Sequence, residues 1–178
     1  MKPAPFEYVA PDSLDGALAA MQQHGFDAKP LAGGQSLVPV MNFRLAQPGV
    51  LIDLTGVPGL DGIWHGSLHF GSMVRQARLE REPLVAQHQP LLAEALPHIA
   101  HPQIRNRGTF GGSLAHADPA AELPVIAVAL NGRFKLQSAT GERWIAARDF
   151  FTSLFDTDLG DEELLVEIVL PPLPARTG

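Results

Sequence analysis

The chain has 178 residues, of which 46% are hydrophobic and 18% are charged, with a net charge of −6 and no cysteine. This balance excludes a disordered chain, and the lack of cysteine excludes disulfides, thiol nucleophiles and cysteine-ligated zinc or iron–sulfur sites within it. The acidic charge argues against broad binding to nucleic acid, although backbone N–H groups can still hold a small anion.

Neither the N-terminus nor the apolar runs predict a secretory signal or a membrane span. The first five residues, from Met1 to Pro5, are not followed by an apolar stretch. The longest apolar run, residues 125–130, is far shorter than the roughly 20 residues that a membrane helix needs. We therefore expect a cytoplasmic protein without a membrane span.

The first third of the chain predicts a small parallel βαβ-type unit, which we place in an N-terminal subdomain of residues 1–57. An apolar stripe at helical spacing predicts a helix over residues 13–24, with Asp12 or Ser13 as its cap and Gly25 at its end. A strand at 29–32, a helical stretch at 37–45 and a strand at 50–54 follow.

The rest of the chain, residues 58–178, predicts a second subdomain with helices and a mainly antiparallel sheet. Asp118 is expected to cap a helix over 119–130, with Pro119 in its first position. Residues 101–118 are rich in glycine and are expected to be irregular. The other predicted elements are a hairpin of 63–64 and 68–70 around His65-Gly66, helices at 74–81 and 90–99, a hairpin of 133–137 and 142–145, and a final strand at 164–170. The fold class is α+β.

Two segments, residues 31–37 and 107–113, each combine a pair of glycines with hydroxyl side chains. Consecutive glycines allow the backbone to come close to a ligand, and successive N–H groups can converge on an anion. The two segments together could hold a diphosphate from two sides. The alternative is two tight turns without a ligand. The sequence contains no dinucleotide-binding G-x-G-x-x-G, P-loop, nucleophile elbow or H-E-x-x-H pattern.

These segments resemble the two flavin motifs of the FAD-binding medium subunit of molybdenum hydroxylases of the carbon monoxide dehydrogenase and xanthine dehydrogenase type. The resemblance extends from about Phe6 to Pro172. The first motif is carried by residues 30–37 together with Met41, Arg44, Pro48 and 51–54, and the second by residues 103–113 and 118–122. Phe150-Phe151 and residues 163–165 are similar to later landmarks of the family.

The resemblance implies a PCMH-like FAD-binding fold of two α/β subdomains and a set of cofactor-binding residues. Residues 31–37 would surround the diphosphate and the adjoining ribityl chain, and residues 109–113 would approach from the other side. Glu122 stands where the family has an Asp that bonds flavin-side hydroxyls, and Asp118 would contact the cofactor or cap its helix. The implied set is Leu31, Ala32, Gly33, Gly34, Gln35, Ser36, Leu37, Ile99, Thr109, Gly111, Gly112, Ser113, Asp118, Glu122 and Leu165, with Ile99 and Leu165 against the flavin ring.

The resemblance implies an oxidoreductase subunit that transfers electrons through FAD. Its partners would be a small subunit with iron–sulfur clusters and a large subunit with molybdopterin, and the electrons would leave for an external acceptor. No side chain of this chain is expected to act as a catalyst or to bind a metal. The family's C-terminal domain, which carries a Lys near the flavin, is expected to be absent. A stand-alone FAD-dependent reductase or oxidase and a non-catalytic nucleotide-binding module remain as alternatives.

We assign no binding site to several other polar residues. The pairs His65/His69 and His98/His101 are not expected to bind a metal, because neither pair lies on a regular helix face. Arg105 and His116 lie next to the second glycine-rich segment. We expect both to be exposed loop residues, with a supporting or partner-contacting role as the alternative.

Overall fold

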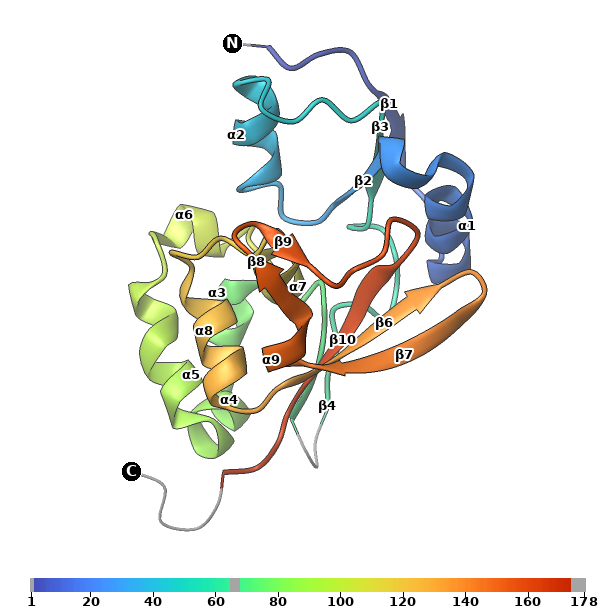
Figure 1. Ribbon diagram of the computed structural model, residues 1–178. Helices are drawn as coiled ribbons and strands as arrows, with labels where there is room; N and C mark the ends of the chain where they lie inside the picture. Colours follow the sequence, from blue (N-terminus) through green and yellow to red (C-terminus); the bar gives the residue numbers. More distant parts are fainter. Residues whose placement is uncertain (1, 65–67, 174–178) are drawn as a thin grey trace.

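A computed structural model describes residues 2–64 and 68–173 and shows a small N-terminal lobe packed against a larger second lobe (Figure 1). The small lobe contains a parallel sheet of three strands in the order β1–β3–β2. Its elements are β1 (Glu7–Val9), α1 (Leu14–His24), a 3₁₀ turn (Gly25–Asp27), β2 (Ala28–Leu31), α2 (Leu37–Asn42) and β3 (Val50–Asp53). The predicted parallel unit is confirmed.

The start of α1 is set by the cap that the sequence predicts. The Ser13 side chain accepts a hydrogen bond from the Gly16 N–H at 3.2 Å, which satisfies one of the unpaired amides of the first turn. Strand β1 was not predicted, because it lies in a short segment between Pro5 and Pro11. It pairs with β3 from Glu7 opposite Val50 onward. A strand at the edge of a sheet tolerates such flanking prolines.

The larger lobe is built on an antiparallel sheet of five strands in the order β4–β5–β10–β6–β7, as expected from the hairpins. These strands are β4 (Ile63–Trp64), β5 (Leu68–Gly71), β6 (Arg133–Ser138), β7 (Gly141–Ala146) and β10 (Leu164–Leu170). A separate hairpin consists of β8 (Phe151–Ser153) and β9 (Asp156–Thr157). The predicted turn at His65-Gly66 lies outside the described residues.

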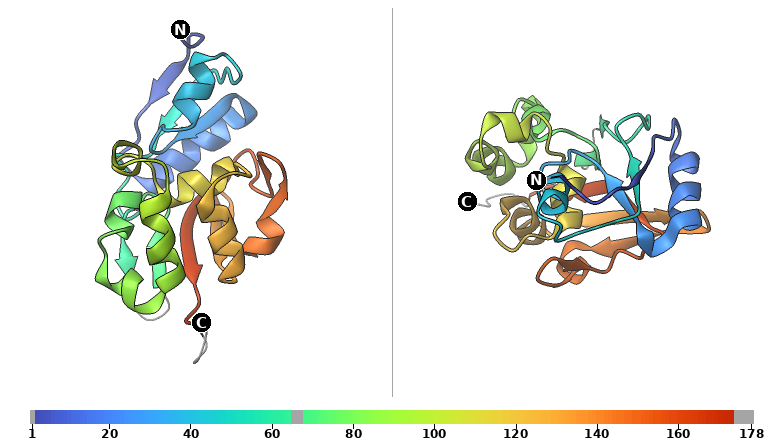
Figure 2. Two further views of the ribbon diagram at one scale, coloured as in Figure 1. Left: turned by 90° about the vertical axis from the view of Figure 1, so that its left-hand side faces the viewer. Right: turned by 90° about the horizontal axis from the view of Figure 1, so that it is seen from above.

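Short helices cover one face of the five-stranded sheet (Figure 2). They are α3 (Gln76–Leu79), α4 (Pro83–His88), α5 (Pro90–Ala95), a 3₁₀ turn (Leu96–His98), α6 (Pro102–Arg105), α7 (Phe110–His116), α8 (Glu122–Ala129) and α9 (Ala147–Phe150). No helix in the ranges 2–64 and 68–173 is long and apolar enough to cross a membrane.

Two of the helix predictions are wrong. Residues 101–118 are not irregular, because they contain α6 and α7, and Thr109 caps α7 by accepting a hydrogen bond from the Gly112 N–H at 3.0 Å. Helix α8 does not start at Pro119 but at Glu122. The Asp118 carboxylate accepts from the Ala120 N–H at 2.9 Å instead, in a turn that precedes the helix.

The last strand, β10, belongs to both hydrophobic cores. Its Leu164 and Val166 pack with the small lobe, whereas Leu165 and Ile168 pack with the helices of the large lobe. Strand alternation places Leu164 and Val166 on one face and Leu165 on the other, and a β-bulge between Leu165 and Glu167 then brings Ile168 to the face of Leu165. The core of the small lobe also includes Leu60 and Met73, which, like Leu164 and Val166, follow residue 57 in the chain. The subdomain boundary between residues 57 and 58 stays a prediction.

Candidate cofactor-binding site

A cavity of about 640 Å³ lies between the two lobes. This volume is in the range of sites for cofactors and other small molecules. All of the predicted site residues line it except Leu31. Leu31 ends β2, and its carbonyl oxygen accepts a hydrogen bond from the Leu54 N–H at 3.0 Å, so its backbone fixes the strand from which the first glycine-rich segment leaves.

The first glycine-rich segment offers a row of backbone N–H groups to the cavity. Within the described part of the chain, no protein acceptor is found for the N–H groups of residues 33–37. Gly34 has a φ of 72°, which other residues adopt only with strain and which turns the chain between β2 and α2. The Ser36 hydroxyl does not cap α2. Unpaired amides in succession, followed by a hydroxyl, form the kind of concavity that binds phosphate oxygens.

The second glycine-rich segment is different, because protein atoms already accept from its amides. The Phe110 and Gly111 N–H groups donate to the carbonyl oxygens of Val74 at 2.9 Å and Ser72 at 2.8 Å. The Gly112 N–H donates to the hydroxyl oxygen of Thr109. The N–H groups of residues 110–112 are therefore not free for a ligand, and the approach of this segment to a diphosphate stays a prediction. What this segment presents to the cavity is the first turn of α7 and its Ser113 side chain.

Two of the glycines allow close backbone packing rather than access for a ligand. A Cβ atom on Gly33 would lie 2.3 Å from the Arg107 carbonyl oxygen, and one on Gly111 would lie 2.5 Å from the Ser72 Cβ. These distances are far below van der Waals contact. Gly33 and Gly111 thus let the first segment, the second segment and the end of β5 meet at one place in the cavity wall.

Arg105 is buried, which corrects the expectation of an exposed loop residue, since it is only 7% exposed. Its guanidinium donates to both carboxylate oxygens of Glu80, at 2.8 and 3.3 Å, and to the Ile99 carbonyl oxygen at 2.8 Å. Ile99 and Ala100 line the cavity, and Ala100 has a φ of 44°. The buried arginine therefore fixes the strained turn that forms one end of the site.

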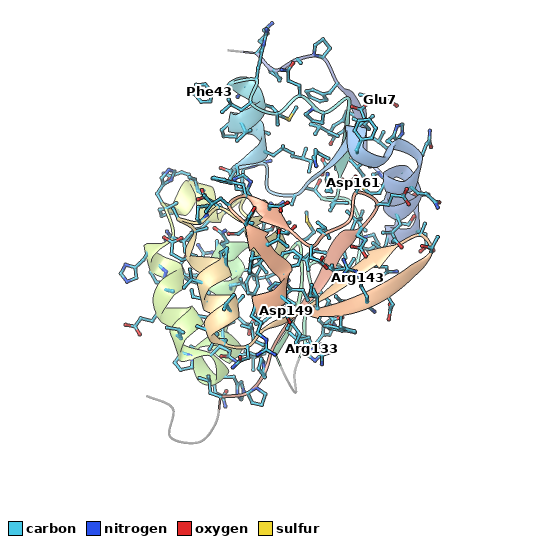
Figure 3. All side chains as sticks on the ribbon, in the orientation of Figure 1. Glu7, Phe43, Arg133, Arg143, Asp149 and Asp161 are labelled. Atoms are coloured by element: carbon cyan, nitrogen blue, oxygen red, sulfur yellow. The ribbon has the colours of Figure 1, made fainter. Side chains whose placement is uncertain are left out.

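An acidic segment between β9 and β10 forms another part of the wall, and Arg143 of β7 holds it in place. Asp161 and Glu163 line the cavity. The Arg143 guanidinium donates to both carboxylate oxygens of Glu163, at 2.8 and 2.7 Å, and to the Asp158 carboxylate at 2.6 Å. Figure 3 labels Arg143 on its strand and Asp161 in the acidic segment. These hydrogen bonds hold the pKa of Glu163 below its ordinary value despite partial burial of the carboxyl.

Asp118 and Glu122 both line the cavity, at the turn that leads into α8. The Asp118 carboxylate accepts a hydrogen bond from the Ala120 N–H. Glu122 is the first residue of α8, and it is the residue through which this helix reaches the cavity. Among the described residues, no group of three or more His, Asp or Glu side chains is arranged to hold a metal ion.

His116 is also not a fully exposed loop residue. It is partly buried at the last position of α7, lines the cavity, and its ring centroid lies 5.5 Å from that of Phe155. Sequence analysis missed Phe155, which reaches the cavity from the turn between β8 and β9. The only signal in the sequence is the pair of apolar residues Leu154 and Phe155 between polar neighbours, and that signal is weak.

The sequence of this chain is similar to subunits of several dehydrogenases. Residues 4–173 match the family described as the FAD binding domain in molybdopterin dehydrogenase. The chain is 47% identical over 180 residues to subunit alpha of the 6-hydroxypseudooxynicotine dehydrogenase complex of Paenarthrobacter nicotinovorans, covering 100% of this chain and 61% of the relative. It is 43% identical over 180 residues to the carbon monoxide dehydrogenase medium chain of Hydrogenophaga pseudoflava, covering 100% and 63%.

Solved structures show the same relationship. The carbon monoxide dehydrogenase from Hydrogenophaga pseudoflava that lacks the Mo-pyranopterin moiety superposes with a TM-score of 0.95 at 44% identity, covering 98% of this chain and 62% of that one. Quinoline 2-oxidoreductase from Pseudomonas putida 86 gives 0.94 at 41% identity, covering 98% and 61%. The chain thus spans 61% to 63% of the length of these relatives. The family match over nearly all of its residues, together with this fold, shows that the chain belongs to the FAD-binding family of the molybdopterin dehydrogenases.

Proposed function

We propose that this chain is the FAD-binding part of an electron-transfer subunit in a molybdopterin-dependent hydroxylase or dehydrogenase complex. Partner subunits would hold the iron–sulfur clusters and the molybdopterin, as the family name and the relatives named as subunits of complexes suggest. When bound, FAD supplies the redox chemistry, and the protein supplies position and electrostatics. The cytoplasmic location inferred from the sequence stays a prediction.

The observation that carries this proposal is the row of N–H groups at residues 33–37 without protein acceptors in the described part of the chain. A diphosphate offers several anionic oxygens to such a row, and the Ser36 hydroxyl adds a donor. The acidic net charge of −6 makes this local arrangement more significant, because the chain as a whole does not attract anions.

The remaining parts of the cavity match the other chemical groups of FAD. Ile99 and Leu165 belong to the hydrophobic core and also line the cavity, so the edges that they leave exposed are apolar and suit a flat ring. Carboxylates at Glu122 and Asp161 are acceptors for the hydroxyl groups of a ribityl chain or a ribose. Together with the unpaired amides, these residues fit an extended molecule with a ring, hydroxyls and a diphosphate.

A competition experiment tests the proposed use of the amides. The purified chain is titrated with FAD by calorimetry, and then with FAD in the presence of ADP, adenosine or riboflavin. We expect stoichiometric binding of FAD and competition by ADP, whereas adenosine and riboflavin, which lack phosphate, should compete much less. Equal competition by adenosine and ADP would show that the amides at 33–37 do not bind the diphosphate.

A matched pair of variants makes the test specific for the first segment. Gly34→Val should abolish FAD binding, because a β-branched residue cannot keep a φ of 72° without turning the amides away. Gly141→Val is the control, since a Cβ atom there meets nothing within 4 Å. Circular dichroism checks that both variants are folded. Retained FAD binding in Gly34→Val would contradict the proposal.

A second experiment addresses the partners. The native protein is isolated from its source cells, and its copurifying chains are analysed for iron, acid-labile sulfide and molybdenum. We expect an iron–sulfur chain and a molybdenum-containing chain with it. Isolation with FAD but without these metals would favour the stand-alone reductase or oxidase, and isolation without any flavin would favour the non-catalytic module.

A further inference from the structure

The turn between β8 and β9 presents an aromatic ring to the cavity at the cost of backbone strain. Phe155 has a φ of 57°, which is unusual for a bulky residue, and it lines the cavity while 58% of its surface stays exposed. Its neighbour Leu154 is 73% exposed and does not line the cavity. Strain of this kind persists only where the surrounding structure holds it, and it gathers at ligand sites.

Two contacts hold Phe155 in this conformation. Its N–H donates to the Ala117 carbonyl oxygen at 3.2 Å, and Ala117 itself has a φ of 50°. The His116 ring lies against the Phe155 ring at a centroid distance of 5.5 Å and an interplanar angle of 59°. A third contact closes the turn, because the Thr152 hydroxyl donates to the Asp156 carboxylate at 2.6 Å. The end of α7 and the β8–β9 turn thus stabilise one another.

The strained, half-exposed ring has no role in either hydrophobic core. Burying more of its apolar surface would be favourable, and the residue is one of those that line the cavity. A flat aromatic ligand fits this surface, since aromatic pairs gain energy beyond the burial of area alone. Phosphate and sugar groups gain nothing comparable from a phenyl ring.

On this basis, and resting on the proposed function, we propose that Phe155, supported by His116, contacts one of the two planar rings of FAD. Phe155 touches the cofactor, and His116 is a positioning residue that holds the phenyl ring at its angle. The adenine and the isoalloxazine share the required chemistry, and the test separates them.

The test compares Phe155→Ala with Phe155→Tyr and with Leu154→Ala. FAD affinity is measured by calorimetry and the fluorescence of bound flavin is recorded. We expect Phe155→Ala to weaken FAD binding roughly threefold to tenfold. Phe155→Tyr should restore binding, because it keeps the ring, and Leu154→Ala should behave as the wild type. Circular dichroism should be unchanged throughout, since both side chains are largely exposed.

Two further titrations, with ADP and with FMN, assign the ring. Weaker ADP binding in Phe155→Ala with unchanged FMN binding assigns the adenine, and the reverse result, with a changed flavin fluorescence, assigns the isoalloxazine. Equal affinity and equal fluorescence of FAD in Phe155→Ala and the wild type would overturn the inference, and would leave the tip of the turn as a contact for a partner chain. A wild-type chain that binds no FAD would overturn the proposed function as well as this inference.

Discussion

Gly33 lies directly against the backbone of Arg107, so the two glycine-rich segments touch each other across the cavity wall. A Cβ atom at residue 33 would be 2.3 Å from the Arg107 carbonyl oxygen and 2.8 Å from the Gly108 Cα. The small and large lobes therefore meet through backbone atoms at the proposed diphosphate site. This contact couples the shape of the site to the packing of the lobes.

Replacing Gly33 with Ala should destabilise the fold, because neither backbone segment can move without disturbing the other. We expect the free energy of unfolding to fall by about 1–3 kcal/mol, as for other overpacked sites. Urea unfolding measures the change. Gly141→Ala, at a position with no atom within 4 Å of the added Cβ, should stay within about 0.5 kcal/mol of the wild type. An equal effect of both substitutions would show that the contact is not tight.

The Glu80–Arg105 pair should stabilise the turn at Ile99 and Ala100. In Glu80→Gln the buried guanidinium keeps its bond to the Ile99 carbonyl oxygen but loses its charged partner. We expect a loss of about 1.5–3 kcal/mol, in the range for hydrogen bonds to charged groups. Chemical unfolding measures it. The exposed Glu94→Gln, within α5, is the control and should have little effect. A Glu80→Gln variant as stable as the control would contradict the positioning role of the pair.

The positive φ of Ala100 predicts that a glycine there is stabilising. An L-residue in this conformation costs about 1–2 kcal/mol, whereas glycine adopts it freely and loses somewhat more chain entropy. Ala100→Gly should therefore raise the midpoint of thermal unfolding. Ala19→Gly, at an exposed position inside α1, has the opposite expected sign, a loss of about 1 kcal/mol. Destabilisation in both variants would show that residue 100 is not strained.

The Arg143–Glu163 contact predicts a specific dependence of stability on pH. Because hydrogen bonds from Arg143 lower the pKa of Glu163 in the folded chain, the contact contributes in full above the ordinary value of 4.5. The contribution is lost as the pH falls through the lowered folded pKa. Glu163→Gln should therefore be less stable than the wild type at pH 7, and the difference should shrink on acidification.

Urea unfolding between pH 7 and pH 3 measures this difference. The exposed neighbour Glu162 provides the control, because Glu162→Gln leaves the contact with Arg143 intact. Its curve should follow that of the wild type. An unchanged acid slope in Glu163→Gln would assign the loss of stability in acid to other carboxyl groups.

Sequence periodicity was sufficient for most of the sheet and for α1, where apolar spacing and a Ser13 cap agree. It failed for α7, because Gly111-Gly112 suppresses any expectation of a helix. The helix forms there because Thr109 caps its first turn. Glycine is present at residue 111 because the backbone there packs directly against Ser72. Local sequence contains no signal for a contact between segments so far apart.

The same limit applies to the site. The row of amides at 33–37 follows from local glycine chemistry and could be predicted. The burial of Arg105 could not, because it depends on Glu80, which lies 25 residues earlier in the chain. Phe155 could not be predicted either, since its conformation depends on the end of α7. Residues positioned by distant partners become visible only in the folded chain.

The dual role of β10 has a consequence for the order of events during synthesis. Leu164 and Val166 complete the core of the small lobe, although the rest of that core lies in residues up to Met73. An N-terminal lobe emerging from the ribosome therefore lacks part of its interior until Leu164 and Val166 have been made, about 90 residues after Met73. Such long-range closure is slow, and it leaves apolar surface open to aggregation in the meantime. Chaperones that act on nascent chains would meet this protein before Leu164 and Leu165, which line the cavity, have been made.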